Sequence, residues 1–298
     1  MKIKLSGYVI FFNIIAYTCI SIVTVLCLLP FIIIISGSFT DNTSIVVDGY
    51  RLIPKVFSME AYNTLFRFPR TIIDAYTVTG VNTLVGTALG LFMISMAGYV
   101  LSRKDFKYRN KFSFFIYFTT LFGGGLVPWY IMIVKTFNLK DNLIAICYPG
   151  LMTPFLIILM RTFVASSLPD EIVESAKIDG SGHFRTYAGI VIPIIKPGLA
   201  TVALFLSLNY WNDWFLSSMF ITTTSKYELQ FFLYNMLNSM ETINRMLSGK
   251  GVSVSNNVLP TESTKLAMAV VATGPVLLFY PFVQRYFISG LTIGAVKG

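Results

Sequence analysis

The sequence predicts an all-α integral membrane protein with six spanning helices. Of its 298 residues, 55% are hydrophobic and only 12% are charged, and the mean hydropathy is +0.69, well above that of a soluble domain. The apolar residues gather in continuous runs of about 20, the length that crosses roughly 30 Å of hydrocarbon. Because these runs do not alternate with polar residues, the pattern argues against the strands of a transmembrane barrel.

We expect one transmembrane domain over the whole chain, 1–298, with its core at about 75–285. The first span is predicted at about 10–35, because this run is too long for the apolar region of a signal peptide and lacks a small-residue cleavage site. The remaining spans are predicted at about 75–100, 112–134, 142–164, 198–222 and 266–283.

Small residues set two of these spans apart. The second span is rich in them: Gly80, Gly86, Ala88, Gly90, Ala97 and Gly98. Small side chains let helix backbones approach closely in lipid, so this helix is predicted to lie at the centre of a bundle. The third span contains "FGGGLVP", and its three glycines and Pro128 predict a kink or a break in the helix.

The orientation follows from one short loop, "LSRKDFKYRNK", between the second and third spans. It holds five cations, Arg103, Lys104, Lys107, Arg109 and Lys111, against Asp105 alone. Short loops dense in Lys and Arg stay in the cytoplasm. We therefore expect both termini, and the polar segment at about 165–197, to be cytoplasmic.

The segment after the fourth span has the signals of a helical hairpin. Ser167 and Asp170 have the spacing of a capping box, and Gly180 can take the positive φ that ends a helix. A second amphipathic stretch follows and is closed by Pro193 and Pro197. The segment is predicted to be a helix, a glycine turn and a second helix.

The first helix of this hairpin carries acidic side chains, Asp170, Glu171 and Glu174. One interpretation is an ordinary helix lying on the lipid headgroups. Interfacial helices prefer Lys and Arg on the polar face, however, and anionic lipid repels carboxylates. A protein partner fits better, with the small Ala176 exposed so that the partner can approach closely.

The fragment "ESAKIDGSGHFRTYAGIVIPIIKP" resembles the "EAA" loop of type I ABC importer permeases. The matching positions are Glu174, Ala176, Asp179, Gly180, Ile190, Pro193 and Pro197. Ser175 and Ser181 stand where the pattern usually has alanine, and Ile192 replaces leucine. "IPKVFSMEAYNTLF", "WNDWF" and "VQRYFISGLTIGAVKG" resemble the shorter, six-span permease of the maltose-type carbohydrate-uptake group. "FGGGLVPWY" resembles a branch that handles complex oligosaccharides, including plant-polysaccharide fragments and host glycans.

The resemblance implies a MetI-like permease fold in the bacterial cell membrane. Such a subunit forms half of the path for a carbohydrate, here an oligosaccharide that is either neutral or an acidic glycan fragment. The implied partners are a second permease, two ATP-binding subunits and an extracytoplasmic sugar-binding protein or lipoprotein. The residues implied to couple to the ATPase are Glu171, Glu174, Ala176, Asp179, Gly180 and Pro193.

The chain is not expected to be an enzyme. It contains no G-x-x-x-x-G-K-[ST] phosphate loop, so ATP and Mg²⁺ are expected on the partner subunits and no cofactor on this chain. The lone His183 has no ligand spacing around it, so no metal site is expected. The scattered basic residues argue against nucleic acid. A secondary carrier is disfavoured because only Asp213 is a plausible buried carboxylate.

Candidate substrate-path residues combine hydrogen-bonding groups with flat aromatic faces, which suit the polar edges and C–H surfaces of a sugar. They are Asn209, Trp211, Asn212, Asp213 and Trp214, with Asn82 and Tyr130 as weaker candidates. The alternative is that Trp211 and Trp214 only anchor the helix at the membrane interface.

Overall fold

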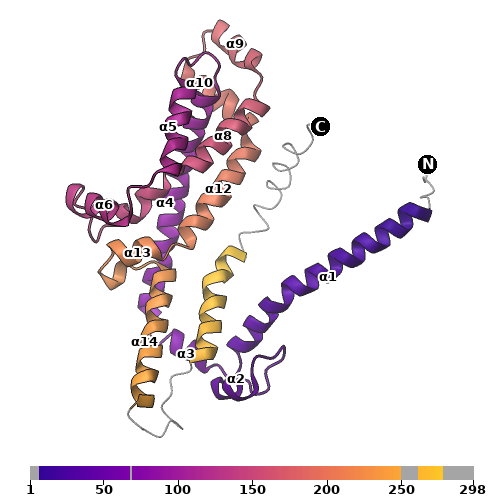
Figure 1. Ribbon diagram of the computed structural model, residues 1–298, viewed down its shortest axis with the longest axis vertical. Coiled ribbons are helices and arrows are strands. Elements are labelled where there is room, and N and C mark those ends of the chain that lie inside the picture. Colours follow the sequence, from indigo (N-terminus) through magenta and orange to yellow (C-terminus); the bar gives the residue numbers. More distant parts are fainter. Residues whose placement is uncertain (1–6, 68, 250–260, 278–298) are drawn as a thin grey trace. The chain divides into compact units, whose positions relative to one another are not determined.

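The computed structural model describes residues 7–67, 69–249 and 261–277 (Figure 1). All regular structure in these ranges is helical, apart from one isolated bridge between Thr40 and Phe57, so the all-α prediction is confirmed. The described residues fall into two compact units. Unit 1 takes in those of Met1–Phe68 and Met236–Gly274, and unit 2 those of Pro69–Asn235 and Pro275–Gly298.

Two described helices, α1 (Gly7–Ser38) and α4 (Pro69–Ser102), are long and apolar enough to cross a membrane. Three bent pairs of helices pass the same test together, which gives up to five candidate spans: 109–121 with 126–136, 143–150 with 154–167, and 183–194 with 196–211. Residues 261–277 are helical, but the rest of the expected span at about 266–283 lies outside the described residues, as does the C-terminal tail. The count of six therefore stays a prediction.

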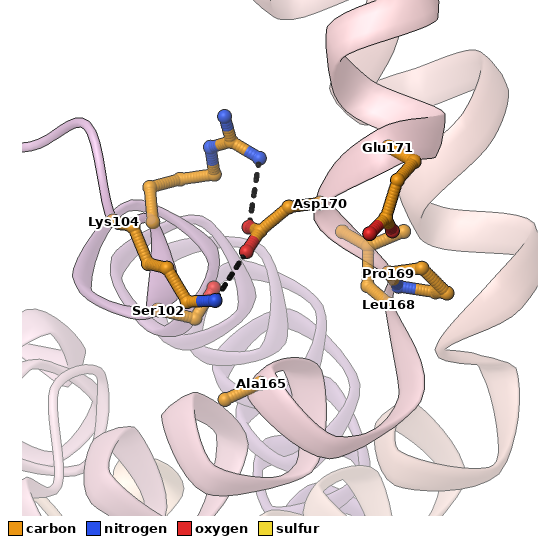
Figure 2. Close-up of a pocket in the computed structure, with 8 residues that line it drawn as sticks. Ser102, Lys104, Ala165, Leu168, Pro169, Asp170 and Glu171 are labelled. Atoms are coloured by element: carbon orange, nitrogen blue, oxygen red, sulfur yellow. Dashed lines mark ion pairs between the residues drawn. The ribbon is translucent and has the colours of Figure 1, made fainter.

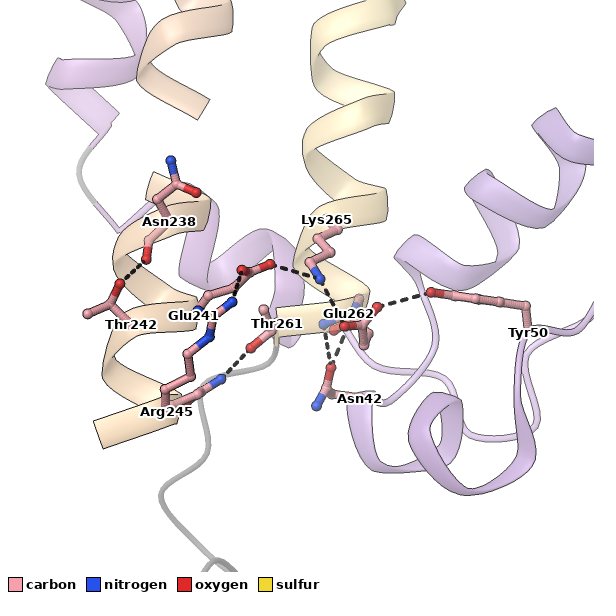
Figure 3. Close-up of polar contacts among 11 residues, drawn as sticks. Asn42, Tyr50, Asn238, Glu241, Thr242, Arg245, Thr261, Glu262 and Lys265 are labelled. Carbon is pink, nitrogen blue, oxygen red and sulfur yellow. Dashed lines mark hydrogen bonds and ion pairs between the residues drawn. The ribbon is translucent and has the colours of Figure 1, made fainter. Parts of the chain in front are cut away.

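Unit 1 is held together by polar contacts between segments that are far apart in the sequence (Figure 3). It contains α2 (Asn42–Asp48) and α3 (Glu60–Leu65). The Asn42 side chain accepts a hydrogen bond from the Glu262 backbone N–H (2.9 Å), which caps the helix at 261–277. Tyr50 donates to the Glu262 carboxylate (3.0 Å), and Lys265 bridges Glu262 and Glu241 (3.0 and 3.1 Å). The N-terminal part of the chain thereby anchors the last described helix.

Unit 2 is built around α4. This helix packs against α8 (Pro154–Ser167) and α12 (Lys196–Trp211), with α5 (Arg109–Leu121) alongside (Figure 1). A Cβ atom added at Gly86 would lie 2.5 Å from the Tyr210 ring, and one at Gly98 would lie 2.6 Å from Met160. These separations are far below van der Waals contact. The small residues of α4 therefore permit the close helix packing that the sequence predicted.

The glycines at 123–125 break the third predicted span. After α5 the chain turns by 112° into α6 (Leu126–Ile131), which continues as a π-helix at Met132–Thr136. Gly125 has φ +87°, a conformation that only glycine adopts without strain. The expected interruption is confirmed. The fourth span is bent by 41° between α7 (Leu143–Cys147), with its short 3-10 turn at Tyr148–Gly150, and α8.

The chain beyond α8 forms the hairpin at 165–197 and then returns along α4. The hairpin comprises α9 (Asp170–Ile178), α10 (His183–Thr186), a π-helix at Tyr187–Val191 and α11 (Ile192–Ile194). It meets α12 at a bend of 85°. After α12 come α13 (Phe215–Phe220), a 3-10 turn at Thr224–Lys226 and α14 (Leu229–Gly249). The fifth span was expected to continue to Thr222, but the helix ends at Trp211.

Gly98→Ala should destabilise the protein, whereas Gly80→Ala in the same helix should not. Both changes replace glycine by alanine, whose higher helix propensity stabilises a helix by about 1 kcal/mol. Only at Gly98 does the new methyl overlap Met160 and approach the Arg161 backbone nitrogen (3.0 Å), whereas nothing lies within 4 Å at Gly80. Overpacking of this kind costs about 1–3 kcal/mol. Apparent melting temperatures of the two variants in detergent measure the difference, and equal values would contradict this packing.

Candidate functional site

The first helix of the hairpin, α9, has well-defined ends. Asp170 and Glu171 lie in its first turn, where negative charge is stabilised by the helix dipole. At its end the Ser181 N–H donates to the Ala176 carbonyl (2.9 Å) and the Gly180 N–H to that of Lys177 (3.0 Å). With Gly180 at φ +77°, this is a Schellman turn, so the predicted glycine stop is confirmed.

The predicted capping box at the start of α9 is wrong. The residue that precedes the helix is Pro169, in extended conformation, and it makes no side-chain cap. Ser167 lies too far upstream to reach the first turn, and its hydroxyl is buried without a hydrogen-bond partner among the described residues. The extended Pro169 sets the start of α9 instead.

The two faces of α9 differ sharply. Glu171, Glu174 and Ile178 are exposed, Ile178 to 86%, as are three further predicted coupling residues, Asp179, Gly180 and Pro193. Ala176 is only 5% exposed. The expectation of an exposed alanine is wrong, because Ala176 follows Val173 by three residues on the inward face. The outward face of α9 thus carries two carboxylates and an open isoleucine.

Ion pairs join α9 to the loop that follows α4 (Figure 2). Lys104 lies 2.8 Å from the Asp170 carboxylate, and Arg103 lies 3.6 Å from it. Arg103 also donates to Asp105 (3.1 Å), and Asp105 in turn pairs with Lys177 in the last turn of α9. We call these five residues the α9 clamp. Beside it is a cavity of about 270 Å³, lined by Ser102, Arg103, Lys104, Ala165, Leu168, Pro169, Asp170 and Glu171.

Both carboxylates of the clamp are held in the charged form. Hydrogen bonds from Lys177 and then Arg103 lower the pKa of Asp105 to about 2, and Lys104 lowers the pKa of Asp170. The stabilisation from these pairs is therefore present at neutral pH and is lost only as acid protonates the carboxylates. The Arg103 side chain is only 10% exposed, so its pairs are screened less than those of the open Lys104.

The second limb of the hairpin also contacts α4. The buried hydroxyls of Ser95 and Tyr187 are hydrogen-bonded at 2.6 Å, and the rings of Tyr99 and Tyr187 are 5.8 Å apart. Leu168 and Val173 belong to the same buried apolar cluster as these tyrosines. Both limbs of the hairpin are thus attached to one end of α4.

The "WNDWF" residues lie where the helix breaks between α12 and α13. The Asn212 amide donates back to the Leu208 carbonyl (2.8 Å), and the Asp213 carboxylate accepts the Leu216 N–H (3.0 Å) at the start of α13. The Asp213 carboxylate thus satisfies a backbone N–H that the start of α13 leaves open, whereas the Asn212 amide adds a second hydrogen bond to a carbonyl that already accepts the Asn212 backbone N–H (3.1 Å). Asn209, one turn earlier, is exposed.

The aromatic candidates are supported by other rings. Trp214 is exposed and packs against Tyr234, with centroids 4.9 Å apart, while the half-buried Trp211 ring lies 6.4 Å from Tyr76. Tyr130 stacks on the buried Phe220 at 5.8 Å. Of the three candidate rings, Trp211, Trp214 and Tyr130, Trp214 is the exposed one, which fits either a sugar or a membrane interface.

A fully buried carboxylate, Glu228, was missed by the sequence reasoning, which expected Asp213 to be the only one. Glu228 has 0% exposure. Asn82 of α4 donates to one of its oxygens (2.8 Å) and Ser217 of α13 to the other (2.7 Å). The next residue, Leu229, donates its N–H to Thr79 (2.8 Å). We call Glu228, Leu229 and their partners Asn82, Ser217 and Thr79 the Glu228 joint. Within it, the Asn82 amide is engaged in a hydrogen bond to another residue of the chain.

Burial raises the pKa of Glu228 to about 7, and the nearby Asp213 adds to the shift, although the bonds from Ser217 and Asn82 oppose it. Glu228 lies outside the candidate spans, between the 3-10 turn and α14. One sequence signal pointed towards such a partner: Asn82 lies within an apolar run, where a side-chain amide needs a hydrogen-bond partner. No local pattern indicates that the partner lies 146 residues away.

The described part of the chain thus combines helices long and apolar enough to cross a membrane with an exposed hairpin at one end of α4. Residues 86–293 match the family described as "Binding-protein-dependent transport system inner membrane component". The chain belongs to this family, whose members are permease components of ABC transporters.

The similarity to individual proteins extends over nearly the whole chain. The chain is 36% identical over 271 residues to Protein LplC of Bacillus subtilis, covering 91% of this chain and 90% of LplC. It is 33% identical over 287 residues to the polygalacturonan/rhamnogalacturonan transport system permease protein YtcP of the same organism, covering 96% and 98%. A solved bacterial ABC transporter involved in import of the acidic polysaccharide alginate has a chain that aligns with a TM-score of 0.78 at 26% identity, covering 96% and 100%.

Glu228→Gln should remove a pH dependence of stability. Below the ordinary pKa of 4.5 the carboxyl is protonated in the folded and the unfolded chain alike. Between pH 4.5 and about pH 7 only the folded chain keeps the proton. The free energy of unfolding therefore falls as the pH rises through this range, by on the order of 3 kcal/mol in all. Glutamine does not titrate, and it can form both hydrogen bonds if its oxygen accepts from Asn82 and its NH2 group donates to the Ser217 hydroxyl.

The measurement is the apparent melting temperature of the full chain in detergent at pH 5 and pH 8. The wild type should lose more stability over this range than Glu228→Gln. Glu60→Gln, the same chemical change at an exposed site, should keep the wild-type difference. Equal pH dependence of wild type and Glu228→Gln would show that the carboxyl does not titrate as described.

Proposed function

We propose that this chain is one of two permease subunits of an ABC importer for oligosaccharides, driven by separate ATPase subunits that dock on α9. The observation that carries the coupling role is the open face of α9: Glu171, Glu174 and Ile178 are exposed beside the tight turn at Gly180. The carboxylates of Glu171 and Glu174 form no ion pair with any described residue, and the Ile178 side chain is open.

The partners follow from what the chain lacks and from its family. The sequence has no phosphate loop, so ATP and Mg²⁺ are assigned to two partner subunits. A second permease would complete the path, and an extracytoplasmic binding protein would deliver the substrate, as the family description implies. The dense Lys and Arg of the loop at 101–111 support a cytoplasmic position for α9 and for both termini.

For the substrate, we favour an acidic oligosaccharide over a neutral one. YtcP is named for polygalacturonan and rhamnogalacturonan, and the aligned transporter imports alginate; all three are acidic polysaccharides. The break between α12 and α13 supplies an exposed amide, Asn209, and an open aromatic face, Trp214, which suit a sugar's hydroxyls and C–H surface. We assign these residues to the path.

Gly180→Leu should leave the protein in the membrane and abolish ATP-dependent uptake. The turn at φ +77° disfavours a side chain, and a bulky one would obstruct docking of the α9 corner. Gly189→Leu is the matched control, because Gly189 is exposed and has nothing within 4 Å of its Cβ position. Membrane content by immunoblot and uptake by cells give the two readouts. Normal uptake by Gly180→Leu would contradict the coupling role of this turn.

Deletion of the gene in its host should reduce uptake of acidic oligosaccharides selectively. The probes are fluorescently labelled oligogalacturonides, rhamnogalacturonan oligosaccharides and alginate oligomers, with arabino-oligosaccharides as neutral comparison. We expect at least a tenfold loss for one acidic probe and recovery when the gene is restored. Loss confined to the arabino-oligosaccharides would overturn the acidic assignment, and unchanged uptake of every probe would overturn the oligosaccharide assignment.

A further inference from the structure

The α9 clamp connects both ends of a short helix to the end of the longest helix in unit 2. Asp170, in the first turn of α9, pairs with Lys104 and Arg103, and Lys177, in its last turn, pairs with Asp105. The three partner residues are consecutive and directly follow α4. A helix held at both ends cannot pivot about one contact.

We propose that the α9 clamp makes α4 and α9 move as one body, so that Lys104, Asp105, Asp170 and Lys177 are positioning residues for energy coupling. This inference rests on the proposed function, because it takes α9 to be the helix that the ATPase subunits move. In this arrangement a displacement of α9 passes directly to the central helix. The exposed face with Glu171 and Glu174 remains free for docking.

The covalent route from the hairpin is less suited to this task. From α9 the chain passes through the Gly180 turn, the π-helix at 187–191 and an 85° bend before α12 begins. Departures from regular α-helix and sharp bends are places where a chain flexes. The clamp bypasses all three, and the buried Ser95–Tyr187 hydrogen bond attaches the second limb to the same helix.

Burial and charge make the clamp persistent. Arg103 is nearly enclosed, so leaving its guanidinium without a carboxylate would strand a charge away from water. Asp105 and Asp170 both have lowered pKa values and stay charged at neutral pH. Val173 and Leu168 add apolar contact beneath the ion pairs. Polar and apolar contacts therefore hold α9 in the same place.

The test compares variants that keep or remove the lysine charges. Lys104→Gln with Lys177→Gln removes the Lys177–Asp105 pair at one end of the clamp and the stronger Lys104–Asp170 pair at the other, and leaves Arg103 with its carboxylates. Lys104→Arg with Lys177→Arg retains the charges. Lys107→Gln with Lys111→Gln is the matched control, because these nearby lysines lie 5.9 and 5.8 Å from the Tyr108 ring and form no ion pair with the described residues.

The readout is the distance between spin labels at Ile172 on α9 and Leu84 on α4, two exposed positions, with Cys19, Cys27 and Cys147 replaced by serine. Pulsed electron paramagnetic resonance is recorded on the whole importer complex, nucleotide-free and trapped with ATP and vanadate. In the wild type, the arginine variant and the Lys107/Lys111 control, trapping should shift this distance by less than about 1–2 Å, the size of ordinary helix shifts.

In the glutamine variant of the clamp, trapping should shift or broaden the distance beyond that limit. A glutamine variant that behaves like the wild type would overturn the inference, and so would a wild-type distance that itself changes on trapping. Vanadate-sensitive ATP hydrolysis by each complex shows that trapping occurred. Failure of ATPase subunits to copurify with any version of the chain would overturn the proposed function together with the clamp.

Discussion

The close packing of α4 against α8 and α12 is the constraint on which the rest of unit 2 depends. In lipid there is no hydrophobic force that drives helices together, so close contact has to come from shape. Gly86 and Gly98 provide that shape, because each leaves room for a large side chain, Tyr210 or Met160, directly against the backbone of α4. A helix fixed in this way over most of its length serves as the frame for both polar sites.

The two polar sites contact α4 at different places: the Glu228 joint at Asn82, within the helix, and the clamp just beyond its last residue, Ser102. Asn82 takes part in the Glu228 joint, and Ser102 precedes the clamp; twenty residues of helix separate them by about 30 Å, close to the thickness of the hydrocarbon core. The Glu228 joint uses a buried carboxylate to fix α13 and the start of α14. The α9 clamp uses ion pairs to fix α9. The same helix thus has a defined polar partner near its middle and another at its C-terminal end.

The sequence predicted those features that depend on local chemistry. The glycines at 123–125 indicated a break, and Gly180 indicated a helix stop, because backbone freedom is a property of the residue itself. The side of α9 on which Ala176 lies was predicted wrongly, since the acidic residues suggested an open face but did not show where Val173 would pack. The pairing of Asn82 with Glu228 was missed because it joins segments 146 residues apart.

The Glu228 joint and the α9 clamp use different kinds of interaction, which suit different roles. At the Glu228 joint the charge-bearing group is fully buried and its two bonds come from neutral donors, so its position is fixed by burial and its charge is costly. At the clamp each carboxylate has cationic partners and the lysines reach solvent, so charge is stabilised and the contact reforms readily. Under the proposed coupling role of α9, the clamp passes force from α9 to α4, while the Glu228 joint holds α4 to α13 and to the start of α14.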